Sequence, residues 1–575
     1  MSSGATAERA PETADALVGV LVANGVDSLF VMPGDAFPVL EAIARREAAG
    51  AACPRVVTCL HEVVALAAAH GHFMVSGRPQ ACLFHVDVGL QMAGGMLHNA
   101  QRGRAGVVIF SGRTPMTVDG SLRGGRVVDV HWMQDRLDLA GVVRGYVKWS
   151  YDLSRAEILP HVVQRAFQVA ASDPAGPVYV SLLRELLLEP AAAVEPLAPE
   201  RYRPPAPGVP ASESLERVAD LIVAAERPVA LAGYVGRSAA GFHALTAFAD
   251  AAAVPVIVRP DRANMSSDSP MYAGPDGGSL LADADLVLLL DVDVPYVPAF
   301  QRLRPGATVV QIDIDPLKPE IPLWGFPVDV ALAGNTAAAL RLLRELVEER
   351  RTPRQEDRLR RRHAELALSN GRQRDEWRAA AAAAATETPI AVEYLSSRVA
   401  DIVDDETIVV DDSTTARAVV ARYLPTRVPG SYFGPSGSSM GWGSGAAIGA
   451  KLAAPEKTVI NLNAEGNFVS GVPEAALWSA RRAGAPVLTV VYDNAQYAAI
   501  RYGMLHEYGE GAAAQAGFRD LDLSPTPDLV RIAEACGAYG ERVTEPAEIG
   551  PALRRALDAV AGGDSAVLDV VVAAP

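Results

Sequence analysis

The chain has 575 residues, half of them hydrophobic, and carries 52 Lys and Arg against 68 Asp and Glu, which gives a formal net charge of −16. This length exceeds what one hydrophobic core usually organises, so we expect about three domains of roughly 150 to 200 residues each. The negative charge repels nucleic acid and anionic membrane surfaces, which argues against both as partners. The one dense basic run, residues 358–363, is typical of a solvated helix face.

Four cysteines, Cys53, Cys59, Cys82 and Cys536, form no CxxC pair and are few for this length, as is typical of a compartment where thiols stay reduced. The first ten residues have neither a basic start nor an apolar stretch, and no long uninterrupted apolar run occurs in the chain. We therefore expect a soluble, unprocessed, cytoplasmic protein without a membrane segment.

The first 190 residues alternate short apolar runs with amphipathic segments. Strands are predicted at residues 28–31, 55–60, 80–85, 106–111 and 177–182. Helices between them give the βαβ rhythm of a parallel sheet, and so a first α/β domain over residues 1–190. The linker that follows, residues 189–212, is rich in proline, whose missing N–H donors force an extended backbone.

Two further α/β blocks follow the linker. The second block spans residues 191–350, and the third spans residues 389–575. Residues 351–388 between them are charged and alanine-rich, which predicts a helical connector; a solvated helix without a further role fits the same composition. Strands are predicted at 228–232, 254–258, 285–290 and 308–314 in the second block, and at 407–411, 458–463, 486–492 and 566–572 in the third. The predicted fold class is therefore α/β, with three consecutive doubly wound parallel-sheet domains, of which the first and third could share a topology.

A carboxylate stands at the start of an apolar helix in the first block. His61 and Glu62 follow directly on the strand predicted at 55–60, and residues 63–75 after them are almost wholly apolar. Burying a carboxylate at such a junction is costly, so it must be protonated, paired or hydrogen-bonded to a specific group. Glu62 is therefore a candidate functional acid. The alternative is an acid in the first helical turn that interacts with the helix dipole.

The third block contains a Gly/Ser-rich stretch, residues 434–443, that runs into an apolar helix predicted over residues 446–453. Small residues let backbone N–H groups approach a phosphate, and a helix start adds a favourable dipole. A close-packed turn is the alternative. The overlapping run 443–449 also imitates a dinucleotide fingerprint, but the apolar strand that such a fingerprint needs is missing immediately upstream.

Two strands predicted in the third block end in oxygen-bearing side chains. The strand at 458–463 leads into residues 464–467 (Ala-Glu-Gly-Asn), and the strand at 486–492 leads into residues 493–496 (Asp-Asn-Ala-Gln). Carboxylate and carbonyl oxygens are ligands that Mg²⁺ accepts beside phosphate, and open α/β sheets bind ligands at the carboxyl ends of their strands. The pattern indicates a metal site, although acids and Asn are also common turn residues.

Together, the lone glutamate, the Gly/Ser-rich loop and the two strand ends resemble the thiamine-diphosphate enzymes of the acetolactate synthase, pyruvate decarboxylase and benzoylformate decarboxylase group. The resemblance covers essentially the whole chain and implies pyrimidine-binding, central and diphosphate-binding domains in that order. It also implies thiamine diphosphate and Mg²⁺ as cofactors. A homodimer or homotetramer follows, with the active site between the first domain of one subunit and the third domain of another.

The resemblance assigns roles to individual residues. Glu62 matches the family glutamate that hydrogen-bonds the aminopyrimidine ring. Met440 is similar to the bulky apolar residue that props the bent cofactor, and a core methionine is the alternative. Glu465, the side chain of Asn494 and the backbone of Gln496 match the metal ligands. The further residues that the resemblance places at the cofactor are Ser439, Gly441, Gly466 and Asn467.

The metal motif departs from the family pattern at both ends. The family motif starts Gly-Asp-Gly and ends Asn-Asn, whereas this chain has Ala464-Glu465-Gly466 and Asp493-Asn494. Glutamate keeps the charge but reaches one methylene further. The metal could therefore shift, a larger ion could be preferred, or the affinity for the cofactor could fall.

Two residues of the first block match positions that act on the substrate. Asp35 resembles the acid of the pyruvate decarboxylase turn, and His85 stands where benzoylformate decarboxylase-like enzymes carry a catalytic histidine. A histidine that caps a strand end for structural reasons is the alternative for His85. Imidazole titrates near neutral pH and so suits proton transfer. Three more residues could face the same pocket or merely pack at the surface: Gln91, His98 and His131.

The implied function is attack on a 2-oxo acid and decarboxylation, followed by aldehyde release or by carboligation with a second carbonyl acceptor. One alternative is a non-catalytic scaffold relative in which the altered metal motif marks lost cofactor binding; the presence of Glu62 argues against it. Another alternative is a nicotinamide or flavin oxidoreductase, because the run 443–449 is similar to a dinucleotide-binding fingerprint. FAD in the central domain has no convincing signature in residues 213–349.

Overall fold

The structure is a computed structural model that describes residues 10–191 and 197–574. The start of the chain, where no leader is expected, and part of the Pro-rich linker lie outside the described residues. Three sheets of six, five and six strands are present, and all the strand pairs that build them are parallel. The predicted α/β class with three parallel sheets is confirmed.

Contacts within the chain divide it into two compact units. Unit 1 consists of the described residues up to 205 together with residues 435–455 and 469–486. Unit 2 consists of residues 206–434 and 456–468 and the described residues from 487 on. Two helices from the carboxy-terminal third of the chain therefore pack with the first sheet.

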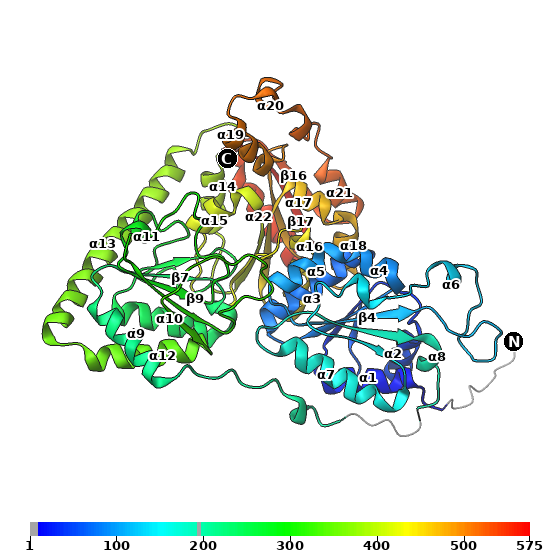
Figure 1. Cartoon of the computed structure of the whole chain (residues 1–575). Coiled ribbons are helices and arrows are strands. Elements are labelled where there is room, and N and C mark those ends of the chain that lie inside the picture. The colour runs from blue at the N-terminus through cyan, green and yellow to red at the C-terminus, as the bar shows by residue number, and fades with distance from the viewer. Residues whose placement is uncertain (1–9, 192–196, 575) are drawn as a thin grey trace. The chain divides into compact units, whose positions relative to one another are not determined.

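The first sheet, in unit 1, has the strand order β2-β1-β3-β4-β6-β5. Its strands are β1 (Ser28–Val31), β2 (Arg55–Thr58), β3 (Gln80–Phe84), β4 (Val107–Arg113), β5 (Ser150–Leu153) and β6 (Val178–Leu183). The helices of unit 1 are α1 (Thr13–Ala23), α2 (Pro38–Ala48), α3 (Glu62–Ser76), α4 (Val86–Met92), α5 (Gly94–Arg102), α6 (Val130–Met133), α7 (Leu159–Ala171), α8 (Arg184–Leu187), α16 (Trp442–Ala453) and α18 (Pro473–Arg482). Figure 1 shows α3 and α5 on one face of the sheet and α1 and α7 on the other.

Helix α3 holds Glu62 at its first position. The helix begins where His61 Nδ1 accepts a hydrogen bond from the Val63 backbone N–H at 3.1 Å, and it ends at Gly77 in the left-handed region, with φ 67°. Almost all of its residues are buried, and it lies against β1 and β3. The apolar run that follows Glu62 is therefore a core helix, which fixes the position of this acid.

Helix α16 crosses α3 at close range within unit 1. A Cβ atom on Gly449 would lie 1.8 Å from the Ala68 carbonyl oxygen, and Trp442 Nε1 donates a hydrogen bond to His70 Nδ1 at 3.0 Å. The glycine run 443–449 thus lies inside a helix, where its glycines permit helix packing. A dinucleotide fingerprint lies in the turn between a strand and a helix, so this run is not one.

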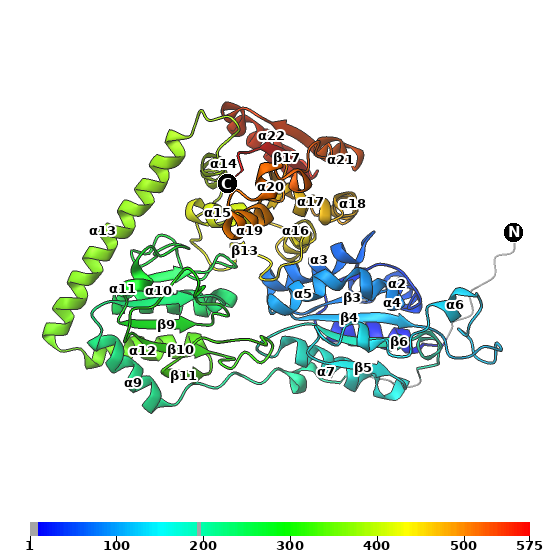
Figure 2. The ribbon, with the colours of Figure 1, turned by 45° about the horizontal axis from the view of Figure 1, so that its top comes forward.

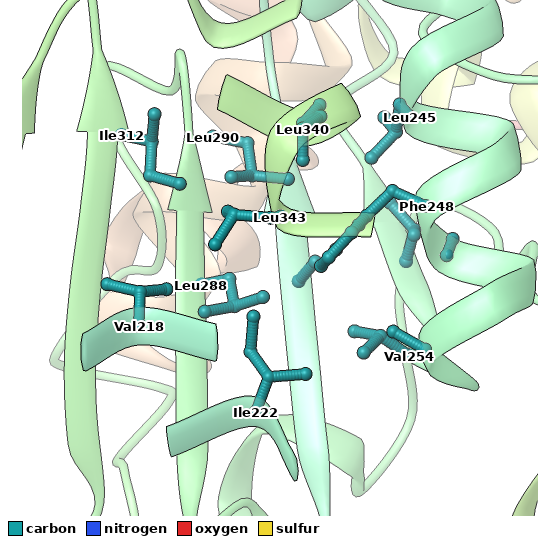
Figure 3. Close-up of a cluster of buried hydrophobic side chains, with 14 of the residues drawn as sticks. Val218, Ile222, Leu245, Phe248, Val254, Leu288, Leu290, Ile312, Leu340 and Leu343 are labelled. Carbon is teal, nitrogen blue, oxygen red and sulfur yellow. The ribbon is translucent and has the colours of Figure 1, made fainter. Parts of the chain in front are cut away.

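The middle sheet, in unit 2, has the order β11-β10-β9-β7-β8. Its strands are β7 (Pro228–Ala232), β8 (Val256–Val258), β9 (Leu286–Leu290), β10 (Thr308–Asp313) and β11 (Val330–Ala333), with helices α9 (Ser212–Ala224), α10 (Ala239–Ala252), α11 (Leu280–Asp283) and α12 (Thr336–Arg350). Figure 3 shows Ile222 of α9, Phe248 of α10 and Leu343 of α12 packed together with strand residues in one buried core. Burial of these apolar side chains is the main term that stabilises this domain.

The predicted connector contains α13 (Pro353–Ala383), a helix of 31 residues. Thr352 begins it as a capping box: Thr352 Oγ1 accepts from Gln355 N, and Gln355 Oε1 accepts from Thr352 N at 2.8 Å. Pro353 occupies the first helical turn, where no N–H is needed. Figure 2 shows α13 as one long, continuous helix.

The third sheet, in unit 2, has the order β13-β12-β14-β15-β17-β16. Numbered within each sheet, the first and third sheets both read 2-1-3-4-6-5, so the shared topology is confirmed. The strands are β12 (Thr407–Asp412), β13 (Tyr432–Phe433), β14 (Thr458–Ala464), β15 (Leu488–Asp493), β16 (Tyr539–Val543) and β17 (Ala566–Val571). The remaining helices are α14 (Val392–Ala400), α15 (Arg417–Tyr423), α17 (Glu465–Ser470), α19 (Ala498–Tyr508), α20 (Ala512–Gln515), α21 (Leu529–Ala535) and α22 (Ile549–Ala561). Four strands were not predicted: β5, β11, β13 and β16.

Within residues 10–191 and 197–574, no helix combines the length and the apolar character that crossing a bilayer requires. All four cysteines are free thiols.

Candidate functional site

The first sheet brings two predicted residues together where β1 and β3 end. The strand order reverses direction between these two strands, and such a switch point leaves a crevice in which open α/β sheets bind ligands. Asp35 follows β1 and His85 follows β3, and the Asp35 backbone N–H donates to His85 Nδ1 at 3.3 Å. A Cβ atom on Gly34 would lie 2.4 Å from His85 Nδ1, so a side chain there would displace the ring.

The ring of His85 is oriented by this bond. Because Nδ1 accepts, the proton of the neutral ring lies on Nε2. His85 occupies the N-cap position of α4 but makes no side-chain capping bond. The ring instead accepts a hydrogen bond from the backbone of the loop after β1, a contact that a structural role at the strand end also explains. Its catalytic role stays a prediction.

Glu62 also lies near His85. Its side chain is buried, and a Cβ atom on Gly89 of α4 would lie 2.9 Å from Glu62 Oε1. Burial raises the pKa of the Glu62 carboxyl, while a backbone hydrogen bond and the nearby His61 and His85 oppose the shift. Unit 1 thus groups Glu62, His85 and Asp35 at one end of its sheet.

Three further side chains reach the Asp35 carboxylate. Gln134 Nε2 donates to Oδ2 at 2.7 Å, Arg184 Nη1 lies 3.5 Å from Oδ1, and His131 Nε2 lies 3.8 Å from Oδ1. All four side chains are buried. Gln134 and Arg184 were missed by the sequence analysis, and His131 was left open. The sequence feature that could have pointed to Arg184 is the charged pair 184–185 directly after an apolar strand.

The Gly/Ser-rich loop packs on α5 from residue 435 onward. Asn99 holds Ser439 by two bonds: the Ser439 N–H donates to Asn99 Oδ1 at 3.0 Å, and Asn99 Nδ2 donates to the Ser439 carbonyl at 2.8 Å. His98 Nε2 accepts from the Ser438 N–H at 3.1 Å, and burial lowers the pKa of His98. His98 therefore supports this loop. Within unit 1 the loop is closely packed against α5, as in the alternative of a close-packed turn.

Met440 and Gly441 end the loop. Met440 is 37% exposed, so the alternative of a core methionine is wrong within this chain. Gly441 has φ 90°, and a Cβ atom there would lie 2.6 Å from the Gly471 nitrogen, so both the conformation and the surroundings require glycine. The cofactor contacts of Ser439, Met440 and Gly441 stay predictions.

The predicted metal ligands lie together in unit 2, at the carboxyl ends of the neighbouring strands β14 and β15. Glu465 Oε2 accepts from the Asn494 N–H at 3.4 Å, and Oε1 accepts from the Gln496 N–H at 3.2 Å. Glu465 is only 3% exposed. Burial raises the pKa of its carboxyl to about 7, and the charge of Asp493 adds to the shift.

These residues fit a divalent cation that also binds phosphate. A buried carboxylate with a raised pKa is destabilised as an anion, and a bound cation relieves this cost. The donors are the Glu465 carboxylate, the Asn494 amide oxygen and the Gln496 backbone carbonyl, all hard oxygens of the kind that Mg²⁺ accepts. In the part of the chain that the structure describes, no group of three or more His, Cys, Asp or Glu side chains could hold a metal ion.

The structure explains the aspartate that departs from the family pattern. Asp493 Oδ1 accepts from the Ala495 N–H at 3.0 Å and supports the left-handed Ala495, with φ 53°. Its other oxygen lies 3.5 Å from Arg542 Nη2, and Arg542 also pairs with Asp569. Burial raises the pKa of Asp569 to about 7, and the negative charge of Asp493 adds to this shift. Asp493 and Asp569 therefore share one cation, Arg542, on the edge strand β16.

Gly466 and Asn467 lie in α17. Asn467 Nδ2 donates to the Asp412 backbone oxygen at 2.7 Å, to Asp412 Oδ1 at 2.9 Å and to Thr414 Oγ1 at 2.8 Å. The amide nitrogen of Asn467 thus ties α17 to the end of β12. A contact between this side chain and a cofactor would use its oxygen.

The middle sheet has a comparable switch point between β7 and β9, where a flavin would be sought. There the Gly236 N–H donates to Asn264 Oδ1 at 3.0 Å, and Arg237 pairs with the buried Asp291. The polar groups at this edge bond one another. They give no support for FAD, and no chemistry is assigned to it.

The first and third sheets share one topology. The first carries a buried acid beside a histidine and an aspartate, and the third carries a set of hard oxygen donors. These features are those of an α/β enzyme that binds a diphosphate cofactor. Three family models match the chain: the N-terminal TPP binding domain of thiamine pyrophosphate enzymes over residues 11–142, their central domain over 215–343, and their C-terminal TPP binding domain over 412–570. The chain belongs to the thiamine pyrophosphate enzyme family.

Curated relatives match most of the chain. A probable 2-ketoarginine decarboxylase of Pseudomonas aeruginosa is 28% identical, over 93% of this chain and 89% of that protein. The benzoylformate decarboxylase of the same organism is 27% identical, over 88% and 90%. The acetolactate synthase isozyme 3 large subunit of Escherichia coli is 26% identical, over 97% and 94%.

Among solved structures, the thiamine diphosphate-dependent 4-hydroxybenzoylformate decarboxylase of Rhodococcus jostii RHA1 has a TM-score of 0.78 at 22% identity, covering 98% of this chain and all of that one. This likeness shows the fold. The family matches do not favour a non-catalytic scaffold or a nicotinamide or flavin oxidoreductase.

Proposed function

We propose that the chain is a decarboxylase of a 2-oxo acid that depends on thiamine diphosphate and Mg²⁺, and that it releases an aldehyde or joins it to a second carbonyl compound. The observation that carries this proposal is the grouping of Glu62, His85 and Asp35 at the switch point of the first sheet. The oxygen donors around Glu465 support the metal. The free thiols fit a cytoplasmic location, which stays a prediction.

Thiamine diphosphate, when bound, supplies a carbanion that adds to the substrate carbonyl and a cationic ring that accepts the electrons released with CO₂. Burial raises the pKa of Glu62, which favours a carboxyl that can hold a proton and pass it to the aminopyrimidine. His85 can donate its Nε2 proton toward the product, and Asp35 is held beside it. Glu465, Asn494 and the Gln496 carbonyl would hold Mg²⁺ and, with it, the diphosphate.

The test is CO₂ release from a panel of aliphatic, aromatic and guanidino 2-oxo acids, with and without thiamine diphosphate and Mg²⁺. At least one acid should be decarboxylated only when both cofactors are present. Glu62→Gln should bind thiamine diphosphate in calorimetry yet lose about 100-fold or more of the rate. Absence of both cofactor binding and turnover would favour the scaffold alternative instead.

A further inference from the structure

Helix α8 carries two buried charged residues immediately after β6, Arg184 and Glu185. Arg184 donates from Nε to the Gly124 carbonyl at 2.8 Å and from Nη2 to the Gly125 carbonyl at 2.9 Å. Both glycines belong to residues 114–137, here named the cover segment. Breaking these bonds would leave a buried guanidinium and two carbonyl groups without partners, which costs free energy. Arg184 therefore holds this part of the segment in place.

Glu185 anchors the beginning of the cover segment. Its Oε1 accepts from the Met116 N–H at 2.7 Å, from the Thr117 N–H at 2.9 Å and from Thr117 Oγ1 at 3.1 Å. Two successive residues of α8 thus bind the segment at separate places. The cation meets backbone carbonyls and the anion meets backbone amides, so each charge has partners of the matching kind.

The cover segment in turn reaches the Asp35 carboxylate. Gln134 donates to it, and His131 lies beside it with its Nδ1 accepting from the Val127 N–H at 3.2 Å, which leaves the ring proton on Nε2, facing Asp35. Arg184 contributes Nη1 from α8. The groups that face Asp35 are therefore Gln134 and His131 of the segment, Arg184 of α8 and His85 at the end of β3.

One guanidinium uses three nitrogens to bind the Asp35 carboxylate and two carbonyls of the cover segment, and it lies 5.7 Å from the centre of the Phe37 ring. Lysine has the same charge but a single ammonium group on a flexible stem, and it cannot reproduce this planar fork. The arrangement therefore depends on arginine and not merely on a positive charge.

We propose that Arg184 is a positioning residue that acts through Asp35, fixing its carboxylate and the cover segment in the one arrangement that the substrate meets. This inference rests on the proposed function, because Asp35 is taken to act on the 2-oxo acid.

A double-mutant cycle tests the route of action. Arg184→Met should lower kcat by about tenfold or more while changing KM less, and Asp35→Asn should also lower kcat. If Arg184 acts through Asp35, the double variant should be no slower than Asp35→Asn alone, since coupled residues are not additive. Losses that multiply would overturn the proposal. Arg184→Lys should recover little, and full recovery by lysine would also count against it.

A second measurement does not need turnover. Trypsin should cleave the cover segment after Arg123 or Arg126 at least about fivefold faster in Arg184→Met than in the wild type, because local opening exposes the backbone. Arg144→Met, which removes an exposed ion pair with Asp138, is the matched control and should change neither proteolysis nor kcat. Equal cleavage in Arg184→Met and the wild type would refute the anchoring. A wild type inactive on every 2-oxo acid would count against the proposed function, while proteolysis would still decide the role of Arg184.

Discussion

A buried histidine outside the proposed site gives unit 1 a pH dependence of its own. His72 of α3 is 1% exposed, with Nδ1 3.1 Å from Ser76 Oγ. Burial lowers the pKa of its imidazole from 6.5 to about 4. Between these values the unfolded chain binds a proton that the folded chain excludes. The stability contributed by the neutral ring is therefore complete above about pH 6.5 and is lost as the pH falls toward 4.

We expect this group alone to cost the wild type about 2 kcal/mol of unfolding free energy between pH 7 and pH 5. Urea unfolding of the wild type and of His72→Gln at the two pH values measures it. The variant, which has no titrating group at this position, should lose less stability by that amount. A drop of the same size in both proteins would show that His72 takes up a proton in the folded state without penalty.

Glu465 offers the sharpest residue-level test of the metal site. Removing its charge takes away the only acid in the proposed donor set, so Glu465→Gln should weaken Mg²⁺-dependent binding of thiamine diphosphate by about tenfold or more. Calorimetry with and without Mg²⁺ measures this. Glu456→Gln, at an exposed position just before β14, is the control and should bind as the wild type does. Equal affinity in both variants would remove Glu465 from the site.

The residues grouped at strand ends were predictable, whereas the residues that hold them were not. His85 directly follows one apolar run, and Asp35 comes shortly after another. Because the ends of neighbouring parallel strands meet at one edge, the pattern and the resemblance together place both residues. Arg184 lies 149 positions from Asp35 in the sequence. No local periodicity states which distant cation pairs with which acid, and that information exists only in the packed fold.

At the scale of elements, the strands missed by the sequence analysis share one physical property. β5, β11, β13 and β16 each form an edge of their sheet. An edge strand has a neighbour on one side only and keeps exposed residues, as in the alternating burial of β11 or the half-exposed β16. Most of these four edge strands therefore lack the apolar runs that identify central parallel strands. For the central strands, most of the predicted ends lie within two residues of the observed ends.

Replacing glycine by alanine should have opposite effects on stability at two helical positions, one at the crossing of α3 and α16 and one in the connector helix α13. Gly449→Ala places a Cβ atom 1.8 Å from the Ala68 backbone oxygen, so we expect it to destabilise unit 1 by about 2 kcal/mol or more. Gly371→Ala in α13 meets no atom within 4 Å and should stabilise its helix by about 0.5–1 kcal/mol.

Urea unfolding of the two variants beside the wild type measures both effects. A tolerated Gly449→Ala with unchanged stability would mean that the two helices can separate at no cost. Such a result would contradict the close packing that assigns the glycines of α16 to helix contact.

At the scale of the whole chain, the three sheets share a strand order but carry different side chains at their switch points. Read within each sheet, the first and third sheets are 2-1-3-4-6-5, and the middle sheet is 2-1-3-4-5. Each order puts a switch point between its first and third strands. In the first sheet this edge carries Asp35 and His85, and in the third it carries Asp412 and Glu465. In the middle sheet Arg237 and Asp291 pair there. The chemistry is therefore divided between two sheets, and neither sheet carries all the proposed groups.

This division makes a prediction about assembly. If Glu62 of one subunit and Glu465 of another serve the same cofactor, as the family resemblance implies, then Glu62→Gln and Glu465→Gln should each have little activity alone when thiamine diphosphate is limiting. A mixed dimer would contain one site with both glutamates mutated and one site with both intact. Random mixing should therefore restore about one quarter of the wild-type activity.

The measurement is CO₂ release after the two purified variants are dissociated, mixed in equal amounts and reassembled, with each variant treated alone as the control. Recovery in the mixture alone would support sites shared between subunits, because no single chain in it has both glutamates. If the mixture stayed as inactive as its parts while the reassembled wild type recovered its rate, the two glutamates would have to act within one chain. The homodimer would then not be needed to complete the site.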